Sequence, residues 1–317
     1  MKKQTLIRLI TALLTGSAAL SPAGAQIASP TAADIVRGAE GRIPAFLACL
    51  RDRKVALVGA HRGGPLPEYP ENAIVTMERT TALVPVFIET DVQESADGVL
   101  FMNHDDVLGR NTAGTGNIAD HSWAQIAALQ LRDPTGQPTD YKAPLFYDLL
   151  VWAKERALIF IDMKPKTNVD RVLEQVDRAG AEGRVMYLAY TIPQAQALLQ
   201  RRPNAVFALP IFNQAHFDAA RVAGLLTPNL MAMVPLAKAD PKLGEAIHAT
   251  GATIMSGTYA GKDTPDSLFR TPADAKAYLS FVQRGAQLIV SNRPVEAAYS
   301  VFGDKAYRTK FQSCLQR

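Results

Sequence analysis

Eight short apolar runs alternate with amphipathic segments along most of the chain. The runs are rich in Val, Ile, Leu and Ala with little polar alternation, which is typical of strands buried on both faces. They comprise residues 55–60, 86–92, 157–163, 185–190, 205–212, 229–236, 252–257 and 286–291. Helix-like segments such as 169–181 and 271–285 lie between them. Repeated strand–helix units predict a (β/α)8 TIM barrel, with a doubly wound open sheet as the alternative.

One connection of the predicted barrel is unusually long. About 60 residues separate the second and third predicted strands, where a typical connection has only a few. The excess, about residues 95–144, predicts a small hairpin-like extension followed by a short helix. Ser122 and Gln125 have capping-box spacing at the start of that helix. We therefore expect a small insertion between strand 2 and helix 2 of the barrel.

The first residues of the chain have the pattern of a cleaved signal peptide. Three cations precede a short apolar run at 9–20, and small residues end at Ala25. The run is too short for a confident membrane span, and no cysteine closely follows the predicted cut, so no stable membrane anchor is expected. The predicted organisation is a signal peptide at 1–25, a lead-in helix at 26–50 and a barrel domain at 51–317. This predicts a periplasmic or secreted protein.

Charge and cysteine content add two expectations. Without the three cations of the leader, 31 basic residues face 30 acidic ones. That balance favours neither a nucleic-acid partner nor a charged membrane surface. Cys49 and Cys314 lie near the two ends of the mature chain, and the termini of a barrel meet in space. In an exported protein this pair predicts a disulfide, with two separate thiols as the alternative.

Polar residues gather where the first three predicted strands end. His61 and Arg62 follow the first strand. The two other strands each end in a pair spaced i, i+2, so that both side chains of a pair point to one side. These pairs are Glu89 with Asp91, and Asp162 with Lys164; His104 follows in the insertion. Since active sites of such barrels form at the carboxyl ends of the strands, these residues predict one site.

The residue types of this site predict phosphodiester chemistry. Three carboxylates on neighbouring strand ends repel one another unless a cation is present, and oxygen ligands favour one divalent Mg²⁺ or Ca²⁺. Arg62 and Lys164 suit a substrate phosphate held against that cation. His61 and His104 provide a general base and a general acid. The expected partner is a small-molecule phosphodiester.

The same residues resemble the glycerophosphodiester phosphodiesterase family. The matching motifs are His61-Arg62-Gly63, Pro70-Glu71-Asn72, Glu89-Thr90-Asp91, Asp97-Gly98 and His104-Asp105, in the order and approximate spacing of that family. The resemblance extends from about Val55 to Tyr299 and implies a (β/α)8 barrel with an insertion after the second strand. It also implies that His61 and His104 form the acid–base pair and that Glu89 and Asp91 are metal ligands.

The chain departs from the family pattern at three places. The third carboxylate belongs to Asp162-Met163-Lys164, where the family has Glu-x-Lys. Asn292 stands where many members have Asp, and the region of Tyr259 lacks a frequent tryptophan. The latter positions are expected to shape the pocket. Pro70-Glu71-Asn72 also fits the start of a helix, with Glu71 or Asn72 as its cap.

The sequence thus predicts an exported, metal-dependent enzyme that hydrolyses glycerophosphodiesters to glycerol 3-phosphate and an alcohol. Asp-x-Lys on the third strand also occurs in the related sphingomyelinase D-like phospholipases. A sphingomyelinase D-like or lysophospholipase D-like enzyme is therefore one alternative, and it requires an apolar rim. A non-catalytic periplasmic binding protein on the same barrel is the other alternative.

Overall fold

The computed structural model describes residues 29–236, 240–259 and 261–316. Its centre is a ring of eight parallel strands in the order β1-β11-β10-β9-β8-β7-β6-β2, closed by pairing between β1 and β2. The strands are β1 (Leu57–Ala60), β2 (Val86–Glu94), β6 (Ile159–Met163), β7 (Val185–Leu188), β8 (Phe207–Pro210), β9 (Leu230–Met233), β10 (Thr253–Gly257) and β11 (Leu288–Ser291). Closure confirms the predicted barrel over the open sheet, and all eight apolar runs form its strands.

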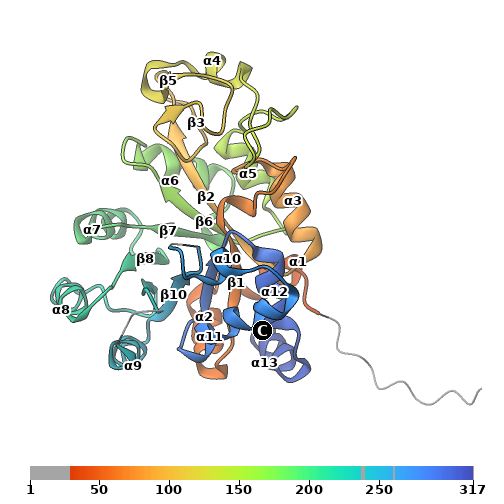
Figure 1. Ribbon diagram of the computed structural model, residues 1–317. Helices are drawn as coiled ribbons and strands as arrows, with labels where there is room; N and C mark the ends of the chain where they lie inside the picture. The colour runs from red at the N-terminus through yellow and green to blue at the C-terminus, as the bar shows by residue number, and fades with distance from the viewer. Residues whose placement is uncertain (1–28, 237–239, 260, 317) are drawn as a thin grey trace, which may run out of the picture.

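Helices surround this ring, as Figure 1 shows. They are α3 (Ile74–Leu83), α5 (Phe146–Trp152), α6 (Val169–Arg178), α7 (Ile192–Arg201), α8 (Gln214–Val222), α9 (Pro241–Ala249), α10 (Pro265–Leu268), α11 (Lys276–Gln283) and α12 (Pro294–Phe302). The strands are buried on both faces, because side chains inside the ring and those beneath the helices belong to one continuous apolar core. This explains why their sequences lack polar alternation.

The segment before the barrel contains two helices, α1 (Ala32–Ala39) and α2 (Ile43–Arg53). Gly41 separates them with a φ of 75°, a left-handed conformation that favours glycine. Both helices pack against the C-terminal helix α13 (Lys305–Leu315). Cys49 of α2 and Cys314 of α13 are joined by the expected disulfide, with their Cα atoms 5.6 Å apart.

The insertion is a small lobe beside the carboxyl end of β2 (Figure 1). It contains β3 (Leu100–Met102), β4 (Val107–Leu108), β5 (Gly116–Asn117) and α4 (Trp123–Ala128). β3 extends the barrel sheet by pairing antiparallel with β2, and β4 pairs with β5. Gln125 reaches back to the backbone N–H of Ser122 at 2.8 Å, which confirms the predicted capping box of α4. A separate small apolar core lies beneath this lobe.

The predicted signal peptide falls outside the described residues. Within the part of the chain that the structure describes, none of the helices combines the length and apolar character needed to cross a membrane.

Candidate active site

A cavity of about 510 Å³ opens at the carboxyl ends of the barrel strands. His61 follows β1 in a 3-10 turn (His61–Gly63), Glu89 and Asp91 lie on β2, Asp162 lies on β6, and His104 comes from the insertion. All five side chains line this one cavity, as expected for a barrel of this kind. The other histidines, His121, His216 and His248, lie outside it.

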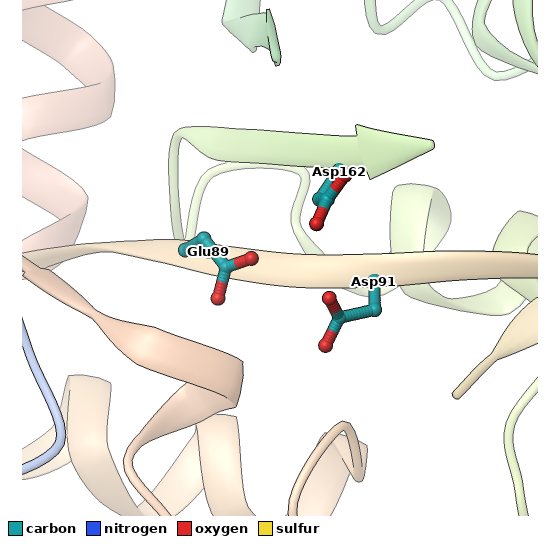
Figure 2. A group of neighbouring side chains, drawn as sticks. All are labelled: Glu89, Asp91 and Asp162. Atoms are coloured by element: carbon teal, nitrogen blue, oxygen red, sulfur yellow. The ribbon is translucent and has the colours of Figure 1, made fainter. Parts of the chain in front are cut away.

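Strand register brings the three carboxylates together. Asp91 lies directly opposite Asp162 in the parallel pairing of β2 with β6, and Glu89 is two residues earlier on the same face of β2. Figure 2 shows Glu89 and Asp91 extending from one side of β2 beside Asp162. One oxygen of each carboxylate lies within 4.8 Å of the others, and all three residues are buried. This acidic triad could hold a metal ion.

The surroundings of the acidic triad fit a hard divalent cation. Burial and repulsion from Asp91 raise the pKa of Glu89 well above its usual range, and burial also raises the pKa of Asp162. The Oδ1 atom of Asp162 is buried and has no hydrogen-bond partner. Since a buried charge without a partner is unfavourable, an added cation would stabilise this arrangement. The donor set consists of oxygen atoms alone, as Mg²⁺ and Ca²⁺ prefer.

Lys164 partly neutralises the acidic triad. Its Nζ lies 2.6 Å from Asp91 Oδ1 and 2.6 Å from Asp162 Oδ2. Burial tends to lower the pKa of Lys164, but the two carboxylates raise it above its usual value. Tyr190, which follows β7, donates its hydroxyl to Asp162 Oδ2 at 2.7 Å. Lys164 is buried and is not among the residues that line the cavity.

Asn72 orients Asp91, and the prediction that it caps helix α3 is wrong. Its Nδ2 donates to Asp91 Oδ2 at 2.7 Å, while its Oδ1 accepts from Thr90 Oγ1 and from the backbone N–H of Asp91. A left-handed backbone (φ 57°) turns the amide toward β2. Helix α3 instead starts after Ala73, which makes no side-chain cap.

Glu71 is likewise not a cap but the centre of a cluster of cations. Arg110 of the insertion donates to both of its oxygens, at 2.8 and 2.6 Å, and Arg62 Nη1 donates at 3.1 Å. Arg62 also donates its backbone N–H to Glu89 Oε2 at 2.7 Å. Arg62 therefore connects the acidic triad with Glu71. Glu71 in turn connects Arg62 with the insertion.

His61 is held by two side chains, Asn292 and Tyr259. Its Nδ1 lies 2.6 Å from Asn292 Oδ1, and its ring stacks on Tyr259 with centroids 4.0 Å apart. Asp266 of α10 accepts hydrogen bonds from the backbone N–H of Asn292 and from Ser291 Oγ, which fixes the loop after β11. Tyr259 lines the cavity, whereas Asn292 is not among the lining residues and contacts His61 instead.

The contact with Asn292 fixes the tautomer of His61. An amide oxygen only accepts hydrogen bonds, so Nδ1 must donate to Asn292 Oδ1. Nε2, which lies 3.9 Å from Glu89 Oε2, then carries the free lone pair of the neutral ring. Burial and the nearby Arg62 guanidinium lower the pKa of His61 to about 4. His61 is therefore neutral and able to accept a proton over most of the accessible pH range.

His104 has a charged partner instead. Its Nδ1 lies 2.7 Å from Asp105 Oδ1, and Arg110 donates to the same carboxylate. Burial acts to raise the pKa of Asp105, but Arg110 and His104 hold it to about 2. An ionised Asp105 only accepts hydrogen bonds, so Nδ1 of His104 is the donor in this contact. The two histidines of the cavity thus have different electrostatic surroundings.

Sequence reasoning missed several residues of this site. It assigned no role to Arg110 or Tyr190, whose partners Glu71 and Asp162 are distant in the sequence, and it used Asp105 only as part of the His104-Asp105 motif. The Asp-x-x-x-x-Arg spacing from 105 to 110 carries no recognisable signal. Of the predicted set, His61, His104, Glu89, Asp91, Asp162 and Arg62 line the cavity.

The fold and the site define a class: a closed α/β barrel with a buried acidic cluster and two histidines at its catalytic face. The model of the glycerophosphoryl diester phosphodiesterase family matches residues 61–205 of the chain. The structure is similar to that of a glycerophosphoryl diester phosphodiesterase from Parabacteroides distasonis, with a TM-score of 0.71 and 29% identity over 79% of this chain and 87% of the other. These matches indicate similarity to the glycerophosphoryl diester phosphodiesterase family over residues 61–205, and to its fold over most of the chain.

Further comparisons agree on family and fold. An uncharacterized protein YqiK of Bacillus subtilis is 33% identical over 134 residues, which is 40% of this chain and 55% of that protein. A glycerophosphodiester phosphodiesterase of Bacillus altitudinis is 28% identical over 41% of this chain and 56% of its own length. The matches thus span just over half of these two relatives. An Oleispira antarctica phosphodiesterase, solved with the product sn-glycerol-3-phosphate, shares the fold at 18% identity, covering 78% of this chain and 97% of its own, with a TM-score of 0.59.

Proposed function

We propose that this protein is an exported, metal-dependent phosphodiesterase that hydrolyses glycerophosphodiesters to glycerol 3-phosphate and an alcohol. The observation that carries the proposal is the convergence of the acidic triad and two histidines in one cavity of a barrel similar to those of this family. Glycerol 3-phosphate is the product named for the Oleispira antarctica structure of the same fold.

Glu89, Asp91 and Asp162 are the residues proposed to hold one divalent cation, Mg²⁺ or Ca²⁺. When bound, such a cation supplies charge stabilisation to a phosphoryl group and lowers the pKa of a hydroxyl or water. Arg62 lines the cavity beside the acidic triad and is placed to neutralise a phosphate oxygen. Lys164 adds its charge through Asp91 and Asp162.

The two histidines are proposed to divide the proton transfers. His61 presents an unprotonated Nε2 to the cavity, which suits a general base that accepts the proton of the nucleophile. His104, beside the ionised Asp105, suits a general acid that gives a proton to the leaving alcohol. In the balanced reaction, one P–O bond to the alcohol breaks and one P–O bond to the nucleophile forms.

Export is proposed from the predicted signal peptide and is supported by the disulfide. Structural disulfides persist in oxidising compartments such as the periplasm or the cell exterior. The Cys49–Cys314 bridge fits such a compartment. We further propose that the signal peptide ends at residue 25 and that the lead-in segment ends at residue 50. The barrel domain then follows, with its insertion at about 95–144.

Release of glycerol 3-phosphate from glycerophosphocholine tests the proposed function. We expect turnover with Mg²⁺ or Ca²⁺, loss of turnover with a chelator, and recovery when the cation is restored. His61→Ala should lower kcat/KM by about a hundredfold to ten-thousandfold, the range for general acid–base catalysis. His121→Ala, whose ring lies in the insertion outside the cavity, is the matched control.

Two outcomes would contradict the proposal. Turnover that persists in the chelator would exclude a cation-dependent reaction. Binding of glycerophosphocholine without turnover, under either cation, would favour the non-catalytic binding protein.

A further inference from the structure

Asp266 of α10 is a carboxylate that the proposed proton transfers do not use. It is not among the residues that line the cavity. Its Oδ1 accepts hydrogen bonds from the hydroxyls of Thr258, Tyr278 and Ser291 at 2.9, 2.9 and 2.8 Å. Its Oδ2 accepts from the backbone N–H of Asn292 at 2.7 Å. The three residues that supply the hydroxyls are buried. Asp266 therefore joins the ends of β10 and β11 to helix α11.

The groups bonded to Asp266 adjoin or include the two side chains that hold His61. Thr258 precedes Tyr259, whose ring stacks on His61 with 12° between the ring planes. The backbone N–H of Asp266 also donates to the carbonyl oxygen of Thr258 at 3.1 Å. Asn292, which bonds to Asp266 through its backbone N–H, holds Nδ1 of His61 through its side chain. Both contacts of the His61 ring thus depend on one carboxylate.

The surroundings of Asp266 favour a carboxylate over an amide. Hydrogen-bond donors lie at both of its oxygens, and an ionised carboxylate only accepts. Burial raises the pKa of Asp266, whereas the four donors favour its ionised form. An amide of the same shape would turn its NH2 group toward a donor in either orientation, which leaves polar groups unpaired.

We propose that Asp266 is a positioning residue for His61. This inference rests on the proposed function, in which His61 is the general base. By holding Tyr259 and Asn292 together, Asp266 keeps the proton of the neutral ring on Nδ1 and leaves Nε2 free on the side of Glu89. Without this carboxylate, Asn292 would move from Nδ1 and the ring proton would occupy Nε2, which then could not accept the proton of the nucleophile.

The kinetics of Asp266→Asn test this role. We expect kcat for glycerophosphocholine to fall about tenfold to hundredfold, with KM changed by less than about twofold, because a misplaced base slows the chemical step and not binding. Cation affinity, measured by calorimetry, should stay at the wild-type value, since the acidic triad lies on β2 and β6. Asp274→Asn is the matched control. Asp274 lies on the same connection and accepts from the backbone N–H groups of Arg270 and Thr271, and its replacement should leave kcat unchanged.

Two further variants separate the positioning of His61 from a general role in folding. In the His61→Ala background, Asp266→Asn should lower the residual kcat by less than about twofold, because a residue that acts through His61 has nothing left to position. Thr258→Val keeps the carboxylate and removes one of its hydroxyl donors, and should lower kcat about threefold. This variant carries the test if Asp266→Asn does not fold.

Nitrogen NMR of the His61 ring provides a readout independent of turnover. The wild-type ring should carry its proton on Nδ1, and Asp266→Asn should shift it to Nε2. The wild-type tautomer in Asp266→Asn, a wild-type kcat in Thr258→Val, or a further large loss in the His61→Ala background would overturn the inference and leave phosphodiesterase activity standing. A shifted tautomer in a protein that hydrolyses no glycerophosphocholine would confirm the positioning and contradict the proposed function.

Discussion

Two asparagine side chains orient the charged groups of the site. Asn72 holds Asp91 through its Nδ2, and Asn292 holds His61 through its Oδ1. Both side chains are neutral amides, so they fix geometry without adding charge. The hydrogen bond with Asn292 raises the pKa of His61, but burial and the nearby Arg62 outweigh it and hold this pKa at about 4.

The first prediction concerns Asn292→Asp. A carboxylate at Nδ1 would favour the imidazolium form and raise the pKa of His61 from about 4. Since the proposed base acts only when it is unprotonated, the acidic limb of the kcat/KM profile should move up by about one pH unit or more. The measurement is the pH dependence of glycerophosphodiester hydrolysis.

Asn204→Asp provides the control for this charge change. Asn204 is exposed and lies before β8, at the end of the barrel opposite the cavity. The pH profile of kcat/KM for the Asn204→Asp variant should match that of wild type. An unshifted acidic limb in Asn292→Asp would show that His61 is not the base.

The second prediction compares two tyrosines of the same strand region. Tyr190→Phe removes the hydroxyl that donates to Asp162, so apparent cation affinity should fall about tenfold, as for other residues that orient a metal ligand. Tyr187→Phe removes a buried hydroxyl that has no partner and should leave cation affinity unchanged. Equal affinities in the two variants would contradict a role for Tyr190 in holding Asp162.

Among the elements, the strands were the most predictable and the loops the least. Each apolar run forms a barrel strand because burial on both faces leaves no room for polar positions. The positions of the strand ends then predict which side chains share a cavity. The proximity of Glu89 and Asp162 follows from that rule alone. The rule predicts where a side chain lies along a strand, but it does not predict which loop residues contact that side chain.

The Pro70-Glu71-Asn72 segment shows why the rest was not predictable. Its local pattern favours a helix cap, but long-range partners determine the outcome. Asn72 bonds to β2, and Glu71 is held by Arg110, 39 residues away. A preference for capping is worth about 1 kcal/mol, and pairing of a buried carboxylate with two guanidinium groups outweighs it.

The third prediction concerns the attachment of the insertion. Arg110→Ala removes the contact between this lobe and Glu71, and also the ion pair with Asp105 inside the lobe that supports His104. We expect kcat/KM to fall about tenfold, which corresponds to about 1.4 kcal/mol. Arg201→Ala, which breaks an exposed ion pair with Asp170 on the outer helices, should change kcat/KM little. Similar activity in both variants would show that the lobe needs no anchor at Glu71.

At the scale of the whole molecule, the two ends of the described chain are covalently joined. The Cys49–Cys314 bridge links residues 265 apart and holds α13 against α2. A bridge across so long a loop restricts the unfolded chain strongly. Neither cysteine lines the cavity, so the bridge contributes to stability and not to chemistry.

The fourth prediction follows from this geometry. Replacement of both cysteines by serine should lower the free energy of unfolding by about 2–5 kcal/mol. The measurement is denaturant unfolding of the oxidised protein and of the variant. The kcat/KM of the folded variant should remain close to that of wild type. A loss of activity at full folding would show that the ends of the chain influence the site.

The central claim is that Glu89, Asp91 and Asp162 form the cation site on which hydrolysis depends. A calorimetric titration of the protein with Mg²⁺ and Ca²⁺ tests it most directly, beside Asp162→Asn and the exposed control Asp170→Asn. We expect one binding site, weakened at least about tenfold in Asp162→Asn and unchanged in Asp170→Asn. Equal binding in all three proteins would place the cation elsewhere and exclude the acidic triad as its site.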